Sequence, residues 1–220
     1  MKKINIFAGH YGSGKTNLSV NYALMLKEEH EDVIVCDIDT VNPYFRTKDS
    51  KEVFDRNGIR LIAPEFANSN LDIPSISAAV NKAFDDPGTY SVFDVGGDDA
   101  GAVALGQFAD KIQNSEYEMF LVVNKYRPLT KKPVDVVEYK NDIEAVCRIK
   151  FTGIINNSNV GEDTSAEYVL ASDEYAQEVS KLTGLPLVYT SVTPDIYDDV
   201  KDALSSALKI NIYKKTAWKV

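Results

Sequence analysis

Short runs of apolar residues recur along the 220-residue chain, and each is followed by turn residues and a longer segment with helical spacing. The runs read INIFA, VIVCD, IRLIA, YSVFD, MFLVV, KFTGIIN and PLVYTS. Several are apolar at every position, a pattern typical of parallel strands that helices cover on both faces. The alternation predicts an α/β protein: a single three-layer domain with a mostly parallel sheet of about seven strands and helices on both faces.

The segments between these runs carry apolar residues at helical spacing. In the first of them, Leu18, Tyr22 and Met25 share one stripe. We expect helices over 16–29, 73–84, 101–113, 133–146, 165–183 and 194–208. The chain shows no repeat, linker or low-complexity tract, so residues 1–208 are expected to form one domain, followed by a tail of residues 209–220.

Composition narrows the classes of partner. The formal net charge of -9 opposes phosphate backbones, so nucleic acid is not an expected partner. The first apolar run is too short for a signal peptide, and no later segment approaches the ~20 apolar residues of a membrane span. Cys36 and Cys147 lack the spacing of a disulfide framework or a metal site. We therefore expect a cytoplasmic protein with two reduced thiols.

The segment from Gly9 to Thr16, GHYGSGKT, matches G-x-x-x-x-G-K-[ST] and lies between the first apolar run and the first predicted helix. Glycines let backbone N–H groups converge on phosphate oxygens, and the helix N-terminus adds its positive dipole end. Lys15 is expected to reach the β- and γ-phosphates, while the Thr16 hydroxyl binds Mg²⁺. The expected phosphate-binding residues are Gly9, Gly12, Ser13, Gly14, Lys15, Thr16 and Asn17. The dinucleotide fingerprint G-x-G-x-x-G does not occur in the sequence, which argues against a Rossmann site.

Carboxylates follow two of the predicted strands, where a nucleoside triphosphatase holds its magnesium ion. Asp37 and Asp39 end the second strand, and their spacing of two puts them on one face of an extended chain. Asp94 ends the fourth run, and Gly97 follows it, small enough for a close approach to a γ-phosphate. Any one of these carboxylates alone fits a solvated turn, but together with the phosphate loop they favour a magnesium site. The expected metal ligands are Thr16, Asp37, Asp39 and Asp94.

The phosphate loop, CDIDTVNP and FDVGGDDAG together resemble the MinD/ParA-type P-loop ATPases, which have CobQ/CobB-type enzymes as relatives. The resemblance extends over about residues 2–208, with its specific motifs in three loops. It implies that Asp39 positions the attacking water, and that Asp37 and Asp94 support the magnesium shell. In the dimerising members of the family the loop begins G-K-G-G, and its lysine reaches the partner's nucleotide; here His10 takes that place.

His10 is open to three interpretations. It sets the conformation of the loop, makes a weaker γ-phosphate contact, or faces a small-molecule substrate. A neutral histidine is shorter than lysine and carries no full charge at pH 7, so it cannot replace a cationic finger across an interface. The chain is accordingly expected to be a monomer or a homodimer.

The base is expected to be adenine. NKYR at 124–127 nearly matches the guanine-reading N-K-x-D, but arginine in the last place cannot accept hydrogen bonds from guanine. An asparagine amide at the end of GIINN can both donate to and accept from adenine, and the resemblance points to Asn156. The same resemblance places Pro194 and Asp195, in TSVTPDIYDDV, beside the base. Asn156 as a turn residue and Pro194 as a helix start remain alternatives.

These features predict an Mg²⁺-dependent ATP-binding protein, a slow ATP hydrolase that acts as a nucleotide switch for a protein client, with Lys15 and Asp39 as catalytic residues. One alternative is a small-molecule kinase or ATP-dependent ligase of the CobQ/CobB or dethiobiotin-synthetase kind, with His10 and Arg46 facing the substrate. Another is a non-hydrolysing nucleotide-binding partner of a metal or redox enzyme.

Two basic segments carry weaker signals. Arg127, Lys131 and Lys132 form a local positive patch that is expected to be an ordinary solvated loop, with a docking surface as the alternative. The tail KINIYKKTAWKV is expected to pack or extend, because it is short and lacks the sustained apolar face of a membrane-surface helix.

Overall fold

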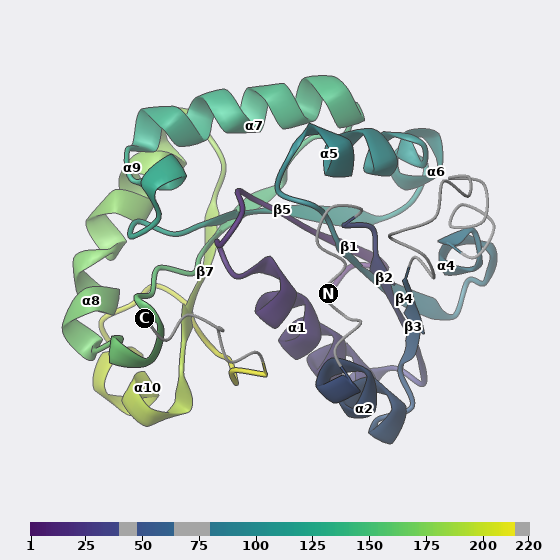
Figure 1. The fold of residues 1–220 in the computed structure, drawn as a ribbon, viewed down its shortest axis with the longest axis horizontal. Helices are drawn as coiled ribbons and strands as arrows, with labels where there is room; N and C mark the ends of the chain where they lie inside the picture. Colours follow the sequence, from purple (N-terminus) through teal and green to yellow (C-terminus); the bar gives the residue numbers. More distant parts are fainter. Residues whose placement is uncertain (40–47, 64–79, 214–220) are drawn as a thin grey trace.

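The centre of the protein is a parallel sheet, seen in a computed structural model that describes residues 1–39, 48–63 and 80–213. Eight strands within these ranges form one sheet in the order β3-β2-β4-β1-β5-β6-β7-β8. The strands are β1 (Ile4–Ala8), β2 (Asp32–Asp37), β3 (Arg60–Ile62), β4 (Thr89–Asp94), β5 (Tyr117–Val123), β6 (Gly153–Asn156), β7 (Leu187–Val192) and β8 (Ala207–Lys209). Each neighbouring pair is parallel, and Figure 1 shows the sheet crossing the middle of the molecule. The predicted α/β architecture is confirmed.

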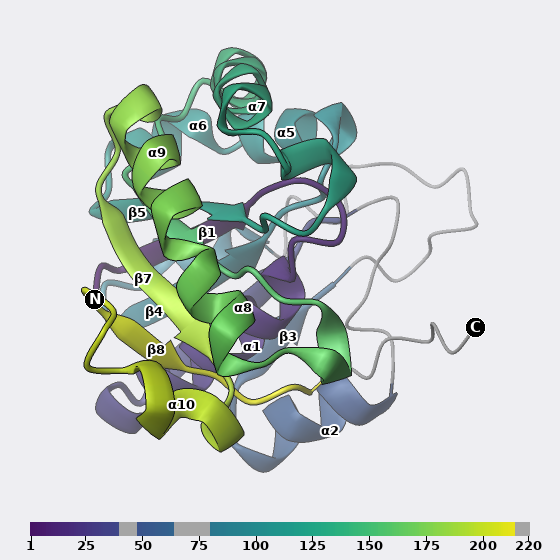
Figure 2. The same cartoon turned by 90° about the vertical axis from the view of Figure 1, so that its left-hand side faces the viewer.

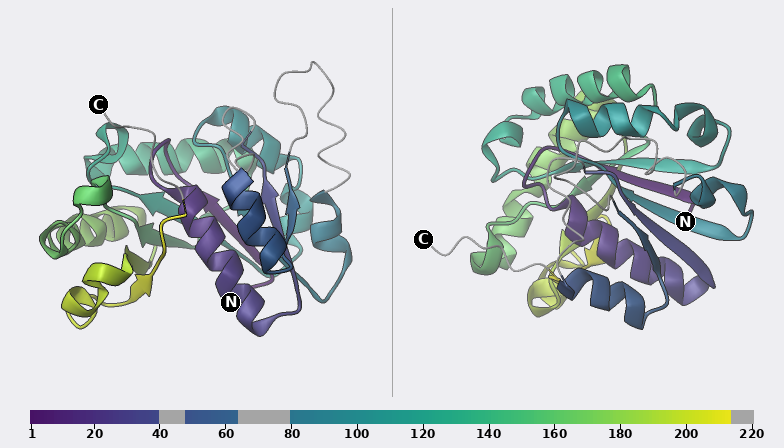
Figure 3. Two further views of the ribbon diagram at one scale, coloured as in Figure 1. Left: turned by 60° about the horizontal axis from the view of Figure 1, so that its bottom comes forward. Right: turned by 45° about the vertical axis from the view of Figure 1, so that its right-hand side comes forward.

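Helices cover both faces of the sheet, as the apolar runs predict. They are α1 (Lys15–Glu29), α2 (Lys48–Arg56), α4 (Lys82–Asp85), α5 (Asp99–Gly106), α6 (Ala109–Gln113), α7 (Pro133–Cys147), α8 (Ala166–Ala171), α9 (Asp173–Thr183) and α10 (Pro194–Val200). Figures 2 and 3 show α1 and α2 on one side of the sheet and α5 and α7 on the other. One buried cluster lies under α5, α6, α7 and α9, and a second lies under α1 and α2. No helix in the described ranges is long and apolar enough to cross a membrane.

The register of the sheet brings predicted site residues to one edge. Asp94 at the end of β4 lies opposite Phe7 of β1 and Asp37 at the end of β2. The neighbouring strands are parallel, so their carboxyl ends meet at this edge. β1 has β4 on one side and β5 on the other. The loop after β1 therefore leaves the sheet at the switch point where α/β proteins bind ligands.

Two predicted helices are each divided in the structure. Residues 101–113 form α5 and α6 in place of one helix. Residues 165–183 likewise divide between α8 and α9 at Ser172, whose hydroxyl donates to the carbonyl of Val169 at 2.7 Å. Serine competes with the helical backbone for hydrogen bonds in this way, so it favours a break that apolar spacing alone does not reveal.

The prediction of one helix over 194–208 was wrong beyond Val200. Residues 207–209 form β8 and pair with β7 in parallel register. Pairing at the edge of a sheet thus overrides the helical spacing of this segment, because tertiary context dominates intrinsic propensity. The helix predicted over 73–84 falls mostly outside the described residues, which include only its end, α4.

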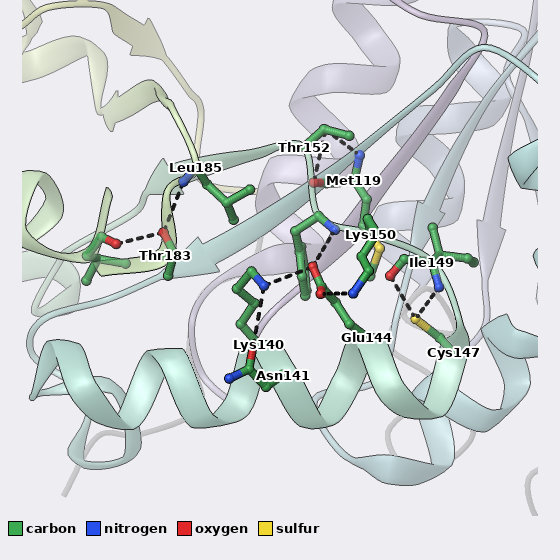
Figure 4. Close-up of polar contacts among 12 residues, drawn as sticks. Met119, Lys140, Asn141, Glu144, Cys147, Ile149, Lys150, Thr152, Thr183 and Leu185 are labelled. Carbon is green, nitrogen blue, oxygen red and sulfur yellow. Dashed lines mark hydrogen bonds and ion pairs between the residues drawn. The ribbon is translucent and has the colours of Figure 1, made fainter. Parts of the chain in front are cut away.

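A buried carboxylate fixes α7 to the sheet. Glu144, only 6% exposed, accepts hydrogen bonds from Lys150 Nζ (2.7 Å) and the Phe151 backbone N–H (3.0 Å), and it lies 3.1 Å from Lys140 Nζ (Figure 4). On the same connection, Thr152 Oγ1 accepts from the Met119 N–H at 2.9 Å. A paired and hydrogen-bonded buried charge has little freedom to move. These contacts tie the end of α7 to the start of β6 and so fix the helix that faces the phosphate loop.

Candidate functional site

A cavity of about 740 Å³ opens at the switch-point edge of the sheet. It is lined by the phosphate loop and the first turn of α1, by Asp39, by the loops after β5, β6 and β7, and by Ile210 and Ile212. A volume of this size accommodates a nucleotide, since pockets for small ligands occupy roughly 300–1,000 Å³. Of the predicted site residues, those that line it are Gly12, Gly14, Lys15, Thr16, Asn17, Asp39, Pro194 and Asp195.

The phosphate loop has the backbone geometry that its glycines allow. Gly12 and Gly14 have φ values of 80° and 89°, in the left-handed region that other residues rarely enter. The N–H of Ser13 donates to the carbonyl of His10 at 3.1 Å and closes a turn inside the loop. A Cβ on Gly14 would lie 2.1 Å from the Asn157 amide nitrogen, so no other side chain fits there. A Cβ on Gly9 would meet the carbonyl of Val122 in β5 at 2.3 Å, which explains this glycine by packing.

Lys15 lies folded against the loop that carries it. Its Nζ donates to the carbonyls of Gly9 (2.7 Å) and His10 (3.2 Å), and the side chain is 7% exposed. Burial lowers the pKa of Lys15, while the negative charges of Asp94, Asp39 and Asp98 raise it. Two loop carbonyls therefore hold the ammonium, and a phosphate oxygen can replace them as acceptors.

Asp94 and Thr16 form the polar contact at the base of the site. Thr16 Oγ1 donates to Asp94 Oδ2 at 2.7 Å, and Ser19 Oγ donates to Oδ1 at 3.4 Å. Burial raises the pKa of Asp94 to about 6, although Lys15 and the bond from Thr16 lower it. The carboxylate is 2% exposed, so it orients the hydroxyl from behind and does not line the cavity.

The other two predicted acidic site residues, Asp37 and Asp39, differ in their position: one is buried and the other lines the cavity. Asp37 is 1% exposed, and its Oδ1 accepts the N–H of Asp39 at 3.0 Å. Asp39 is partly exposed and lines the cavity together with Thr16. A hydroxyl and a carboxylate are oxygen ligands of the kind that Mg²⁺ takes, so these two residues fit that ion. Within the described part of the chain, no group of three or more His, Cys, Asp and Glu residues forms a separate metal site.

Gly97 lies directly against the phosphate loop. A Cβ on Gly97 would approach the Tyr11 backbone nitrogen to 2.5 Å and the Gly9 carbonyl to 3.1 Å. Two residues later α5 begins, capped by Asp98, whose side chain accepts the N–H of Gly101 at 3.1 Å. The loop after β4 and the phosphate loop therefore touch through their backbones, and this contact needs a residue without a side chain.

The predicted base contact lies one residue away from the cavity wall. Asn156 is fully buried, donates to Ser172 Oγ at 2.8 Å and accepts from Ser158 Oγ at 2.6 Å. Asn157, not Asn156, lines the cavity, and its Nδ2 donates to the carbonyl of Ser13 at 2.6 Å. Successive side chains of an extended chain point to opposite sides, so the buried amide of Asn156 and the amide of Asn157 in the cavity wall are one residue apart.

The structure shows where His10 and Arg127 lie relative to the phosphate loop. The His10 ring packs on Tyr139 of α7 with centroids 4.0 Å apart, which agrees with a role in loop conformation. Partial burial lowers the pKa of His10, and the positive charge of Lys15 lowers it further. Arg127, expected to be solvated, lines the cavity and donates from Nε to the carbonyl of Gly12 at 3.0 Å. The signal in the sequence that could have placed Arg127 in the site was its position in N-K-Y-R, which nearly matches a base-reading motif. Arg46 lies outside the described residues.

Comparison with known proteins identifies the fold. No protein-family model matches the chain, and no curated protein matches it. Solved structures do. FtsY from Thermotoga maritima is 18% identical, with a TM-score of 0.58 over 87% of this chain and 62% of that one. The signal recognition particle receptor FtsY from Elizabethkingia anophelis in complex with GDP is 18% identical, with a TM-score of 0.57 over 87% and 58%.

Chloroplast FtsY from Physcomitrella patens is 16% identical, with a TM-score of 0.57 over 86% of this chain and 58% of that one. The chain thus spans about six-tenths of the length of these structures. At 16–18% sequence identity, this similarity establishes a shared fold. Together with the phosphate-loop motif at the switch point, it shows that this chain shares the α/β fold of these structures, a parallel sheet with helices on both faces.

Proposed function

We propose that the protein is an Mg²⁺-dependent ATP-binding switch of the MinD/ParA-like kind, with slow hydrolysis and a protein client in the cytoplasm. The observation that carries this proposal is the Thr16–Asp94 hydrogen bond beside a phosphate loop whose lysine is held by the carbonyls of Gly9 and His10. It joins two motifs that are 78 residues apart in the sequence into one magnesium–triphosphate site. Asp39 lines the same cavity.

Each part of the site has a role in this proposal. The backbone N–H groups from Gly12 to Thr16 bind the phosphates, and Lys15 turns from the loop carbonyls to the β- and γ-phosphate oxygens. Thr16 and Asp39 hold Mg²⁺, with Asp94 and Asp37 orienting them from behind. The ion neutralises charge on the phosphates when it is bound. Asp39 also positions the attacking water.

For the base we favour adenine, held by Asn157 with Pro194 and Asp195 nearby. Support comes from the amide of Asn157 in the cavity wall, because an amide can both donate to and accept from adenine. Guanine is the competing base. The carboxylate of Asp195 also lines the cavity, and a carboxylate can accept hydrogen bonds from guanine. One structural neighbour is described in complex with GDP.

Calorimetric titration with Mg-ATP and Mg-GTP tests the site and the base together. We expect the parent protein to bind Mg-ATP more tightly than Mg-GTP, and a Lys15→Ala variant to lose measurable binding of both. Lys132→Ala is the matched control, because Lys132 is exposed and does not line the cavity. Undiminished affinity in Lys15→Ala would remove the phosphate-site assignment, and a preference for GTP would replace adenine by guanine.

Hydrolysis is tested separately from binding. An Asp39→Ala variant is expected to lose turnover, because the water is no longer oriented, while its Mg-ATP affinity falls less than that of Lys15→Ala. Phosphate release under saturating ATP measures this loss. Equal turnover in the variant and the parent would contradict the role of Asp39. Light scattering during the titration shows whether the nucleotide changes a monomer into a dimer.

A further inference from the structure

The C-terminal segment, residues 210–213, lies along the first two turns of α1. The side-chain amide of Asn21 makes two hydrogen bonds with the backbone of Asn211. Its Nδ2 donates to the Asn211 carbonyl at 2.9 Å, and its Oδ1 accepts the Asn211 N–H at 2.8 Å. One turn earlier, Asn17 Oδ1 accepts the N–H of Tyr213 at 3.1 Å. Two asparagines four residues apart share one helix face, so they act on the segment as a neighbouring strand would.

These contacts set the direction of the two isoleucines of the segment. Ile210 is 3% exposed and belongs to the apolar cluster under α1 and α2, whereas Ile212 is 53% exposed. Both line the cavity that also contains Lys15 and Thr16, and Ile196 of α10 lines it too. A large exposed aliphatic side chain in the wall of a concave site is an apolar surface that a ligand can cover.

The cavity wall therefore combines two kinds of lining. The phosphate loop supplies backbone N–H groups, a lysine and a hydroxyl, which suit phosphates and a metal ion. Ile196, Ile210 and Ile212 supply no hydrogen-bonding side chain and suit a flat, weakly hydrated ring. A nucleotide has these two chemistries in one molecule.

We propose that residues 210–213 form the apolar wall that receives the base of the bound nucleotide, with Asn17 and Asn21 as the positioning residues that hold this wall. The inference rests on the proposed nucleotide function and assigns a part of that site which the sequence treated as a tail. Asn17 directly follows Thr16, so the turn of α1 that binds magnesium also holds the base wall. One helix, α1, would thereby position both the phosphates and the base of the nucleotide.

Inorganic triphosphate separates this inference from the function on which it rests, because it carries the phosphates without a base. Calorimetry with Mg-ATP and Mg-triphosphate is carried out on the parent, Ile212→Ser and the control Val134→Ser. Val134 is 56% exposed, close to the 53% of Ile212, but it does not line the cavity. Ile212→Ser is expected to weaken Mg-ATP about tenfold through the loss of apolar contact, and to leave Mg-triphosphate within twofold. Val134→Ser should change neither.

The outcomes are distinct. Unchanged Mg-ATP affinity in Ile212→Ser overturns the base wall, and so does an equal loss for both ligands, because the segment would then act on the phosphate loop. A parent that binds neither ATP nor GTP overturns the proposed function itself. These results are separable because Lys15→Ala removes both ligands, whereas Ile212→Ser is expected to affect only the one with a base.

Hydrogen exchange tests the positioning role of the asparagines. In the parent, Mg-ATP is expected to slow exchange at the Asn211 and Tyr213 amides, and Mg-triphosphate to slow it much less. In Asn21→Ala the Asn211 amide should exchange faster without ligand, and the Mg-ATP affinity should fall in parallel with Ile212→Ser. Equal protection by both ligands would contradict the inference, as would an Asn21→Ala variant that keeps full Mg-ATP affinity.

Discussion

The two halves of the cavity differ in how they are built. The phosphate half consists of residues 9–16 with Asp94 behind them. Two left-handed glycines and hydrogen bonds within the loop set its backbone, and Asp94, Arg127 and Asn157 add contacts from outside. The base half combines the ends of β6 and β7 with residues 210–213, and its contacts cross long stretches of chain. A site that depends on backbone conformation leaves a spacing pattern in the sequence. A site assembled from side chains of distant segments leaves none.

A hydrogen bond between Asn157 and Ser13 connects the two halves. Asn157, which comes from the base half, donates to the carbonyl of Ser13 in the phosphate loop, and Ser191 of β7 donates to Asn157 in turn. Gly14 lies under this amide with no room for a Cβ. A substitution at Gly14 is therefore expected to disturb both halves, and changes confined to one half test that half separately.

Gly14→Ala is expected to have the largest effect. A left-handed residue with a side chain costs about 1–3 kcal/mol, and the clash with Asn157 adds roughly as much, so the free energy of unfolding should fall by about 2–6 kcal/mol. Mg-ATP binding should be lost with it. The control is Gly184→Ala, which has a φ of 72° but nothing within 4 Å of the added Cβ, and which isolates the strain. Chemical denaturation of both variants measures the difference; equal losses would show that the junction contributes nothing.

Asn156→Ala tests the base half alone. The buried side chain bonds Ser172 and Ser158, so its removal should lower the free energy of unfolding by about 2 kcal/mol. We expect the Mg-ATP affinity to stay within about threefold, because the side chain does not line the cavity. Asn114→Ala, at an exposed helix end, serves as control for loss of an asparagine. A tenfold weaker affinity would return the base contact to Asn156.

Asp94 gives the phosphate half a pH dependence, and it is the smallest of the three effects. Its pKa, raised by burial to about 6, favours the protonated carboxyl in the folded state. The resulting stabilisation is complete below the ordinary value of 3.8 and is lost as the pH rises through about 6. Without metal or nucleotide, the parent should therefore lose about 1 kcal/mol relative to Asp94→Asn between pH 5 and 7.5. Urea denaturation at both pH values measures this, and a constant difference would contradict it.

The fold and the phosphate half follow from the sequence because their signals are local. Apolar runs and the loop GHYGSGKT lead to the parallel sheet and to the position of Lys15 and Thr16. β8 was missed because three residues at a sheet edge depend on their partner strand for their conformation. Asn157 was missed because Asn156 and Asn157 are alike in sequence and differ only in the side of the chain that they face.

The two cysteines have a practical consequence for work on the C-terminal segment. Cys36 and Cys147 are both completely buried, and burial raises the pKa of each thiol. Thiol-directed reagents attack the thiolate, so both native cysteines are shielded from them. A Tyr213→Cys variant would therefore carry one reactive thiol in an otherwise inert background. A fluorophore attached there would report whether a ligand changes the surroundings of residues 210–213, with every native cysteine left in place.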